Sequence, residues 1–375
     1  VITAGAGDVF IGGGATVDQY IPQWDGNNTK TLKGGYMPLG SGFNFNTASD
    51  VNVPTGLAVK KYVDSSINNK NYFNNSGLTV DIENKSAGTT THGQHVGEGW
   101  ELTSVGISSS ATLSRGNATF RGHYSLEMDC DTTDTPTGTD LLLVTHRLEG
   151  YDVASFKFGT SYAEDLVISF WAIGFKAGDY HVIVKNKAND RSYISRYTLV
   201  SAVEQFIELP ITGDTGGVWD IDNTEGLEVI FVLAAGDSYD HTGLTTWLGG
   251  DYRSTPGQVN FLDSTSNYWR ITEPKLEIST SATTWVSPDH GTATDKSERY
   301  YQVLDAQLQA ATATQLGNQT APSWTYKTGM RVNPTGAVTL GGGSGATFAF
   351  GSSSFGQAAA NTIQTTFRVE LDARL

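Results

Sequence analysis

The chain has 375 residues, of which 38% are hydrophobic, 11% aromatic and 17% charged. The hydrophobic fraction is large enough to form a buried core, and the charged fraction is too small for a continuous coiled-coil rod or a long acidic disordered chain. A net charge of −15 argues against nucleic acid and anionic membrane surfaces as partners, and no apolar run is long enough to insert across a bilayer. The single cysteine, Cys130, excludes an internal disulfide framework and a cysteine-based zinc site.

The first 76 residues divide into two segments. Residues 1–52 are rich in Gly, Asn and Thr and cannot pack a core of their own, so they are either a flexible leader or a segment that orders against a partner. Residues 53–76 contain a short helix over 54–67, in which Val59, Val63 and Ile67 repeat at i, i+4 and i+8. A helix this short needs a partner for its apolar stripe, and a second copy of itself is the simplest one. We therefore expect a short parallel helical bundle.

Residues 77–288 carry a series of strand patterns separated by turn-forming clusters, without helical patterns between them. The stretches 166–173 and 227–235 are apolar on both faces, which is typical of central strands. Further strands are expected at 180–187, 192–200, 256–262 and 269–278. This series predicts an antiparallel β-sandwich of the jelly-roll type.

Residues 289–375 begin with a polar link and continue as a smaller β domain. Strands are expected at 323–327, 330–340, 346–350 and 366–372, and the last alternates cleanly between apolar and charged residues. The fold class expected for the whole chain is therefore all-β, with a sandwich body, a short helical segment near the N-terminus and a smaller C-terminal β domain.

Catalytic and metal-binding motifs are largely absent from the sequence. It has no phosphate-binding loop, dinucleotide fingerprint or nucleophile elbow, and nothing selects one carboxylate pair for glycosidase chemistry, so we expect no enzymatic activity. His92 and His95 lack a visible third metal ligand and are expected to be solvated loop residues. The acidic stretches 129–134 and 220–225 could hold calcium, with solvated acidic turns as the alternative. We expect no other cofactor and no metal centre.

One loop has the composition of a sugar-binding surface. It combines aromatic rings, which can stack on a sugar, with charged groups that can hydrogen-bond its hydroxyls. The glycan-binding candidates are Tyr239, Trp247, Asp251, Tyr252 and Arg253. The alternative is structural: Trp247 and Tyr252 would fasten a long loop to the sandwich.

Several strings resemble bacteriophage tail-fibre and receptor-binding proteins. Residues 53–64 (VPTGLAVKKYVD) resemble a helix common in such fibres, and they follow a shaft-like segment in residues 7–35. The middle unit resembles a fibre sandwich with a jelly roll like that of carbohydrate-binding modules, through 168–172 (ISFWA), 226–236 (GLEVIFVLAAG), 257–263 (GQVNFLD) and 269–272 (WRIT). Residues 275–286 (KLEISTSATTWV) and 298–302 (ERYYQ) are similar to two further motifs of that family.

The departures from these motifs are Ser297 in place of Cys, Lys275 in place of Gln and Thr284 in place of Pro, and none removes a chemical role. The resemblance implies a homotrimeric, non-enzymatic virion fibre that binds bacterial surface polysaccharide and attaches through residues 1–52 to a tail hub, an adaptor or the capsid. Val59, Val63 and Ile67 would then form the trimer interface. Two alternatives stay open: a head or collar fibre that decorates the virion, and a capsule depolymerase, although the parallel β-helix repeats usual in depolymerase fibres are absent.

Overall fold

The computed structural model describes residues 23–24, 32–33, 70–84, 87–107, 111–307, 323–340, 347–351, 354–359 and 366–375. The chain divides into two units, Val1–Asn69 and Lys70–Leu375. In the first unit, β1 (Gln23–Trp24) pairs with β2 (Leu32–Lys33). The predicted helix over 54–67, with the trimer-interface candidates Val59, Val63 and Ile67, lies outside the described residues, and the predicted domain boundaries stay predictions. None of the described helices is long and apolar enough to cross a membrane.

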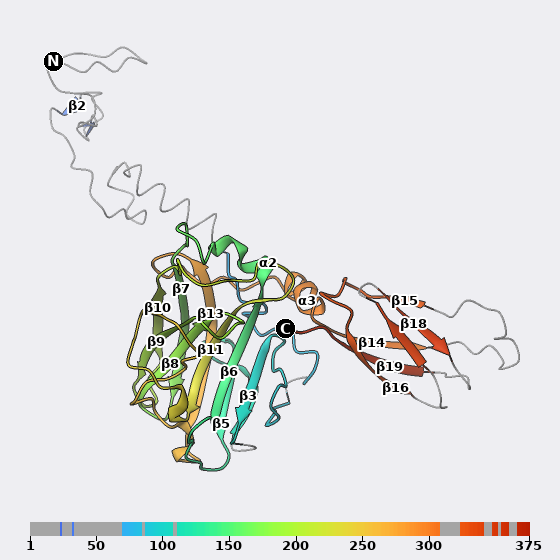
Figure 1. Cartoon of the computed structure of the whole chain (residues 1–375), viewed down its shortest axis with the longest axis horizontal. Coiled ribbons are helices and arrows are strands. Elements are labelled where there is room, and N and C mark those ends of the chain that lie inside the picture. Colours follow the sequence, from blue (N-terminus) through green and yellow to red (C-terminus); the bar gives the residue numbers. More distant parts are fainter. Residues whose placement is uncertain are drawn as a thin grey trace, which may run out of the picture. The chain divides into compact units, whose positions relative to one another are not determined.

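Two antiparallel sheets form the body of the second unit (Figure 1). The five-stranded sheet has the order β10-β7-β13-β5-β4 and the six-stranded sheet the order β12-β9-β8-β11-β6-β3. The strands of the first sheet are β4 (Ala111–Phe120), β5 (His123–Cys130), β7 (Leu166–Gly174), β10 (Gln205–Ile211) and β13 (Tyr268–Ile278). Those of the second are β3 (Trp100–Val105), β6 (Leu141–Glu149), β8 (Gly178–Lys185), β9 (Ser192–Leu199), β11 (Glu225–Ala235) and β12 (Trp247–Leu248). The chain passes repeatedly from one sheet to the other, which confirms the predicted jelly-roll sandwich.

The main core lies between the two sheets and is rich in aromatic rings. Phe231 of β11 is fully buried, with its ring centroid 5.2 Å from Phe170 of β7 and 5.8 Å from Trp269 of β13. The indole Nε1 of Trp269 donates a hydrogen bond to the hydroxyl of Tyr197 at 2.9 Å, so burying these rings leaves neither of these two polar groups unsatisfied. These contacts join strands that are distant in sequence and hold the two sheets together.

Strand β11 is buried on both faces, as its continuous apolar sequence predicts. Residues 227, 229, 231 and 233 face the main core. Ile230 and Val232 face the other way, into a second cluster that also contains Leu141, Leu143, Ile183 and Ile194. We call this second set the outer cluster. Residues 236–256 cover it, through Tyr239, Leu244, Leu248 and Tyr252. Each apolar side chain buried there stabilises the fold by about 1.5–3 kcal/mol.

The prediction of a strand at 256–262 is wrong. These residues form a loop that ends in the short helix η4 (Phe261–Asp263), whose N-cap Asn260 accepts a hydrogen bond from the backbone N–H of Leu262 at 2.9 Å. Phe261 and Leu262 are fully buried although they belong to no strand, so the apolar pattern here reports core packing and not a β ladder. Three further short helices are α2 (Gly150–Val153), η2 (Ala154–Phe156) and η3 (Asp237–Tyr239).

The C-terminal residues form two small antiparallel sheets, as expected of an all-β chain, and the separate C-terminal domain stays a prediction. One contains β14 (Tyr301–Gln307), β19 (Thr366–Asp372) and β16 (Thr335–Leu340), and the other β15 (Ser323–Thr325), β18 (Ser354–Ala359) and β17 (Thr347–Phe350). The segment expected to be a polar link contains a helix, α3 (His290–Glu298), capped by the Asp289 carboxylate, which accepts from the Thr292 N–H at 3.0 Å. Its polar sequence carries no apolar stripe, which is why periodicity missed it.

The residues of the ERYYQ string join α3 to the sandwich. Arg299 donates two hydrogen bonds, at 2.9 and 2.6 Å, to the carboxylate of Glu149 at the end of β6. The Tyr300 hydroxyl donates to the same carboxylate at 3.0 Å, and Gln302 donates to the carbonyl of Glu298 at 2.8 Å. Because the Glu149 side chain is only 2% exposed, this pairing satisfies a buried charge. The roles of these residues are structural, as the sequence suggests.

Candidate functional site

A row of charged side chains crosses the outer face of the six-stranded sheet, the face turned away from the five-stranded one. Glu228 of β11 lies directly between Arg147 of β6 and Lys185 of β8 in the strand register. Its carboxylate is 3.1 Å from the Arg147 guanidinium and 3.3 Å from the Lys185 ammonium. Glu225 and Glu101 pair with Arg147 as well. We call Glu101, Arg147, Lys185, Glu225 and Glu228 the charged row.

Burial makes the pairing in this row necessary. Lys185 is 2% exposed and Glu228 7% exposed. A buried ammonium is stable only when partners replace its lost hydration. Lys185 finds them in Glu228, in the amide oxygen of Asn189 and in Asp251, whose Oδ1 lies 3.1 Å from its Nζ. Asp251 belongs to the covering loop, so this contact ties that loop to the sheet.

Four of the five predicted glycan-binding residues lie together beside the charged row. Arg253 donates two parallel hydrogen bonds to Asp251, at 3.0 and 2.9 Å, and its guanidinium lies 5.0 Å from the centre of the Tyr239 ring. Tyr252 packs on the outer cluster, with its ring 4.5 Å from that of His241. All of these side chains are half-buried, so each presents part of its surface to solvent.

Trp247, the fifth candidate, lies apart from the other four. It forms the short edge strand β12 against Tyr193, and its ring packs on Phe158 and Trp219 at 5.5 and 5.4 Å. The indole Nε1 donates to the carbonyl of Thr212 at 2.6 Å. These contacts are those of a residue that fastens the loop to the sandwich, which is the structural alternative given above.

The sequence reading missed the charged row itself. A recognisable signal was present: Arg147, Lys185 and Glu228 are charged residues in strands rich in apolar residues, at positions that alternate with main-core residues. Strand periodicity places such charges on the outer face. Their convergence depends on the order β8-β11-β6, which no local pattern encodes.

The ionisation of the site is uneven. Burial, followed by the charge of Glu228, raises the pKa of Glu225 to about 7, although Arg147 opposes the shift. Burial also favours the neutral form of Asp251, but hydrogen bonds from Arg253 and the charge of Lys185 outweigh it and lower the pKa of Asp251. Near neutral pH, Asp251 is therefore a permanent acceptor, whereas Glu225 takes up a proton readily.

The proposed metal ligands are dispersed. His95 is buried, contrary to the expectation of a solvated loop, and burial together with the charges of Arg374 and Arg147 lowers its pKa well below the usual value. In the acidic stretch 220–225, the Asp222 carboxylate accepts from the Thr224 N–H at 2.8 Å. Among the described residues, no cluster of three or more His, Cys, Asp or Glu side chains is arranged to hold a metal ion.

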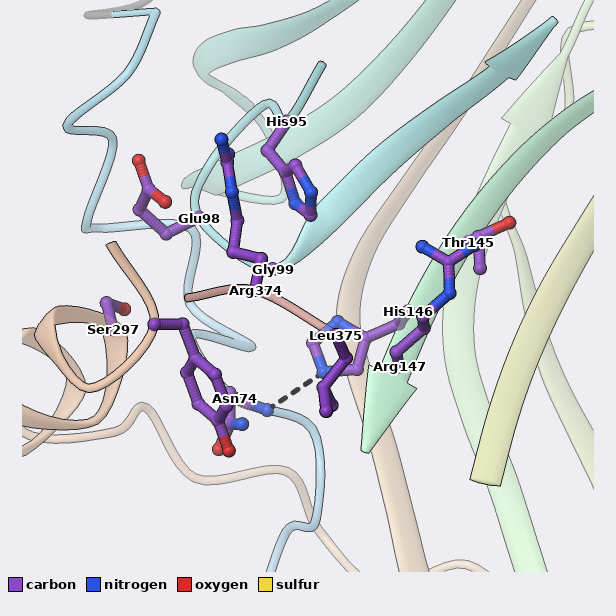
Figure 2. Close-up of a pocket in the computed structure, with 11 residues that line it drawn as sticks. Asn74, His95, Glu98, Gly99, Thr145, His146, Arg147, Ser297, Arg374 and Leu375 are labelled. Atoms are coloured by element: carbon purple, nitrogen blue, oxygen red, sulfur yellow. Dashed lines mark hydrogen bonds between the residues drawn. The ribbon is translucent and has the colours of Figure 1, made fainter. Parts of the chain in front are cut away.

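A small, partly open cavity lies where β3 and β6 meet the C-terminal residues. Figure 2 shows the backbone N–H of Asn74 donating to Nε2 of His146 at 3.2 Å beside it. Burial lowers the pKa of His146 to about 3, so the imidazole is neutral. The volume of about 40 Å³ has room for water and none for a sugar ring. Its lining is Asn74, His95, Glu98, Gly99, Thr145, His146, Arg147, Ser297, Tyr300, Arg374 and Leu375.

The chain matches no protein-family profile and no curated protein sequence. Among solved structures, it is similar to a Bacteroides thetaiotaomicron protein provisionally named as sugar-binding, with 11% identity over 56% of this chain and 100% of that chain and a TM-score of 0.34. A family 11 carbohydrate-binding module of Clostridium thermocellum shares 14% identity over 52% of this chain and 96% of that chain, with a TM-score of 0.28. The enzymatically active domain of tailspike protein 4 of bacteriophage CBA120 shares 12% identity over 56% of this chain and 21% of that chain, with a TM-score of 0.26. Likenesses this distant establish neither family nor function, so the function is inferred below from the chain's own residues.

The raised pKa of Glu225 gives a testable pH dependence. Glu225 has a pKa of about 7 in the folded protein and its ordinary pKa of 4.5 in the unfolded chain. Between these values the folded state holds a proton that the unfolded state has released. The contribution of Glu225 to folding stability is therefore complete below pH 4.5 and is lost as the pH rises through about 7. Glu225→Gln cannot ionise. Its free energy of unfolding relative to the native protein should therefore rise between about pH 5 and about pH 8, by up to about 3 kcal/mol.

Urea denaturation at the two pH values measures this difference. Glu164→Gln, which removes a carboxylate from an exposed ion pair with Lys157, is the matched control for the loss of one negative charge. A flat or falling difference for Glu225→Gln would contradict the assignment.

Proposed function

We propose that this chain is the adhesive, non-enzymatic subunit of a bacteriophage tail fibre, and that it binds bacterial surface glycans on the outer face of its six-stranded sheet. The observation that carries the proposal is the convergence of Tyr239, Asp251, Tyr252 and Arg253 beside the charged row. Tyrosine rings, fixed hydrogen-bond donors and fixed acceptors occur there within one half-buried surface.

These groups match the chemistry of a sugar. A pyranose has a face of C–H groups, which packs on aromatic rings, and a rim of hydroxyls, each of which both donates and accepts hydrogen bonds. Arg253 can only donate and the ionised Asp251 can only accept. Their mutual fork, with Tyr239 against the guanidinium, fixes both side chains before a ligand arrives, which lowers the entropy cost of binding.

Binding without hydrolysis is the favoured activity because the carboxylates of the charged row are already engaged. Glu228 contacts both Arg147 and Lys185, and Glu225 contacts Arg147 at 3.2 Å. A glycosidase needs a carboxylic acid and a second carboxylate free to reach opposite sides of one bond. In the charged row, Arg147 and Lys185 hold Glu225 and Glu228 in place.

The fibre assignment is supported by the sequence strings given above and by the apolar stripe Val59, Val63 and Ile67. Three copies on one axis would bury this stripe, and three glycan sites on one fibre would raise a weak affinity through effective concentration. Attachment through residues 1–52 to a tail hub or adaptor is part of the same proposal. Virion localisation would follow from it.

Substitution of Asp251 tests the glycan site. Asp251→Asn keeps the shape of the side chain but removes the charge that fixes Arg253 and Lys185, so its affinity for polysaccharide should fall roughly tenfold to a hundredfold. Affinity electrophoresis against a panel of purified bacterial surface polysaccharides, with and without calcium, measures the effect.

Glu164→Gln is again the control and should bind as the native protein does. If a folded Asp251→Asn variant bound polysaccharide with native affinity, the glycan site would have to lie elsewhere on the protein. No binding by the native protein to any polysaccharide of the panel, with or without calcium, would refute the glycan-binding proposal.

The oligomeric state tests the fibre proposal separately. Light scattering of the full chain should give about three times the chain mass of 40.2 kDa, and Val63→Asp should return the mass to that of one chain because a charge cannot be buried in the bundle. A native mass of one chain would contradict the helical bundle.

A further inference from the structure

A second aromatic surface lies on the other sheet, on the face turned away from the main core. Trp171 of β7 and Phe206 of β10 are directly opposite in the strand register, with ring centroids 5.4 Å apart and planes at 53°. Phe206 is 47% exposed, and Val203, three residues before it in the chain, is 46% exposed. Paired aromatic rings that are partly exposed on a sheet face are candidate contact points for a ligand or a partner.

The turn between β4 and β5 brings a cation onto this pair. The guanidinium of Arg121 lies 3.6 Å from the centre of the Trp171 ring. Arg121 has a backbone φ of +54°, and Gly122 follows at +78°, which is the pattern of a two-residue hairpin turn that favours Asn or Gly at both positions. Arginine is disfavoured there, so its placement over Trp171 is maintained against local backbone preference.

Glu273, which faces Arg121, is a second strained residue. Its backbone φ is +55°, and it lies at the register shift in β13 between Thr272 and Lys275. Its carboxylate is 3.7 Å from Nε of Arg121, and the carboxylate of Glu204 is 4.0 Å from Nη1. Two non-glycine residues in the left-handed region thus meet over one tryptophan. Strain concentrated in this way is typical of functional sites.

The donors of Arg121 remain available. Both carboxylates lie within ion-pair range but beyond hydrogen-bond distance, and Arg121 makes no hydrogen bond to the residues that the structure describes. A guanidinium that lies over a ring keeps N–H groups at its rim that can donate to a ligand. Arg121 covers one face of Trp171, so Phe206 is the ring left for a ligand.

We propose that Arg121, Trp171, Phe206, Glu204 and Glu273 form a second carbohydrate-binding site, which we call the Trp171 platform, and that it takes a neutral pyranose unit. The C–H face of the sugar packs on Phe206, beside the Trp171 ring that Arg121 covers. One hydroxyl accepts from Arg121, and a neighbouring hydroxyl donates to Glu273 or Glu204. This site uses different residues on a different sheet from the glycan surface described above, so neither depends on the other.

Charge selects the neutral ligand. The Trp171 platform carries one guanidinium against two carboxylates, with the imidazole Nε2 of His123 3.7 Å from the Glu273 carboxylate, on a chain whose net charge is −15. A uronic acid or a phosphate would meet a surplus of negative charge, whereas hydroxyls satisfy both the donor and the acceptors. The same surplus disfavours a second, equally acidic copy of this chain as the occupant.

The experiment is affinity electrophoresis of the full chain in native gels that contain hydroxyethylcellulose, galactomannan or yeast mannan as neutral probes and alginate as the acidic one. Phe206→Ala removes the exposed ring. Arg121→Asn removes the donors and suits the left-handed backbone, so its melting temperature should be no lower than that of the native protein. Tyr162→Ala, at a side chain that is 77% exposed and outside both sites, is the matched control.

We expect at least one neutral polysaccharide to retard the native protein, and we expect Phe206→Ala and Arg121→Asn each to weaken that binding about tenfold or more, with Tyr162→Ala unchanged. Any of three results would overturn the proposal. Both platform variants could bind as tightly as the native protein, alginate alone could retard the native protein, or no neutral probe could retard it. A lower oligomer mass for Phe206→Ala would also overturn it, since the surface would then be a contact between copies. Asp251→Asn, tested in parallel, separates the two sites. If only Asp251→Asn loses polysaccharide binding, the six-stranded face is the sugar site and the Trp171 platform is not. If only the platform variants lose polysaccharide binding, the Trp171 platform is the sugar site and the six-stranded face is not.

Discussion

The structure depends on the burial of β11 on both of its faces. One face completes the aromatic main core, and the other must be covered as well because Ile230 and Val232 point outward. Residues 236–256 provide that cover, and the contact of Asp251 with the buried ammonium of Lys185 holds them in place. The loop is thus part of the fold, and its aromatic and charged side chains are fixed on the sheet. Fixed side chains suit recognition, because their ordering is complete before a ligand binds.

The parts of the fold that sequence predicts well are those in which one strand carries its own signal. The stretches 166–173 and 227–235 are continuous in apolar residues, and both are central strands of their sheets. No strands were predicted from the sequence between Trp100 and Glu149. Glycine, histidine and charge interrupt the patterns of β4 and β5, and the apolar run of β6 is only four residues long before Thr145. The residues 256–262 were misassigned, since a buried loop and a buried strand share the same composition. Helix α3 was missed because nothing in its sequence separates an apolar face from a polar one.

The candidate site divides in the same way. Composition alone pointed to Tyr239, Asp251, Tyr252 and Arg253, and these four lie together in space. It could not reveal Lys185 and Glu228, because their importance comes from register across β8 and β11 and from burial by a distant loop. It could not separate Trp247 from the others either, since a ring that fastens a loop and a ring that binds sugar have the same sequence context. The Trp171 platform was not predicted for a related reason: its residues come from four separate stretches of the chain.

Hydrogen exchange of the full chain, alone and saturated with a polysaccharide that binds it, tests the central claim most directly. Binding at the outer face of the six-stranded sheet should slow amide exchange in peptides that cover residues 237–254, together with the ends of β8 and β11 that carry Lys185 and Glu228. Slowed exchange confined to other surfaces, such as the two C-terminal sheets, would contradict the account.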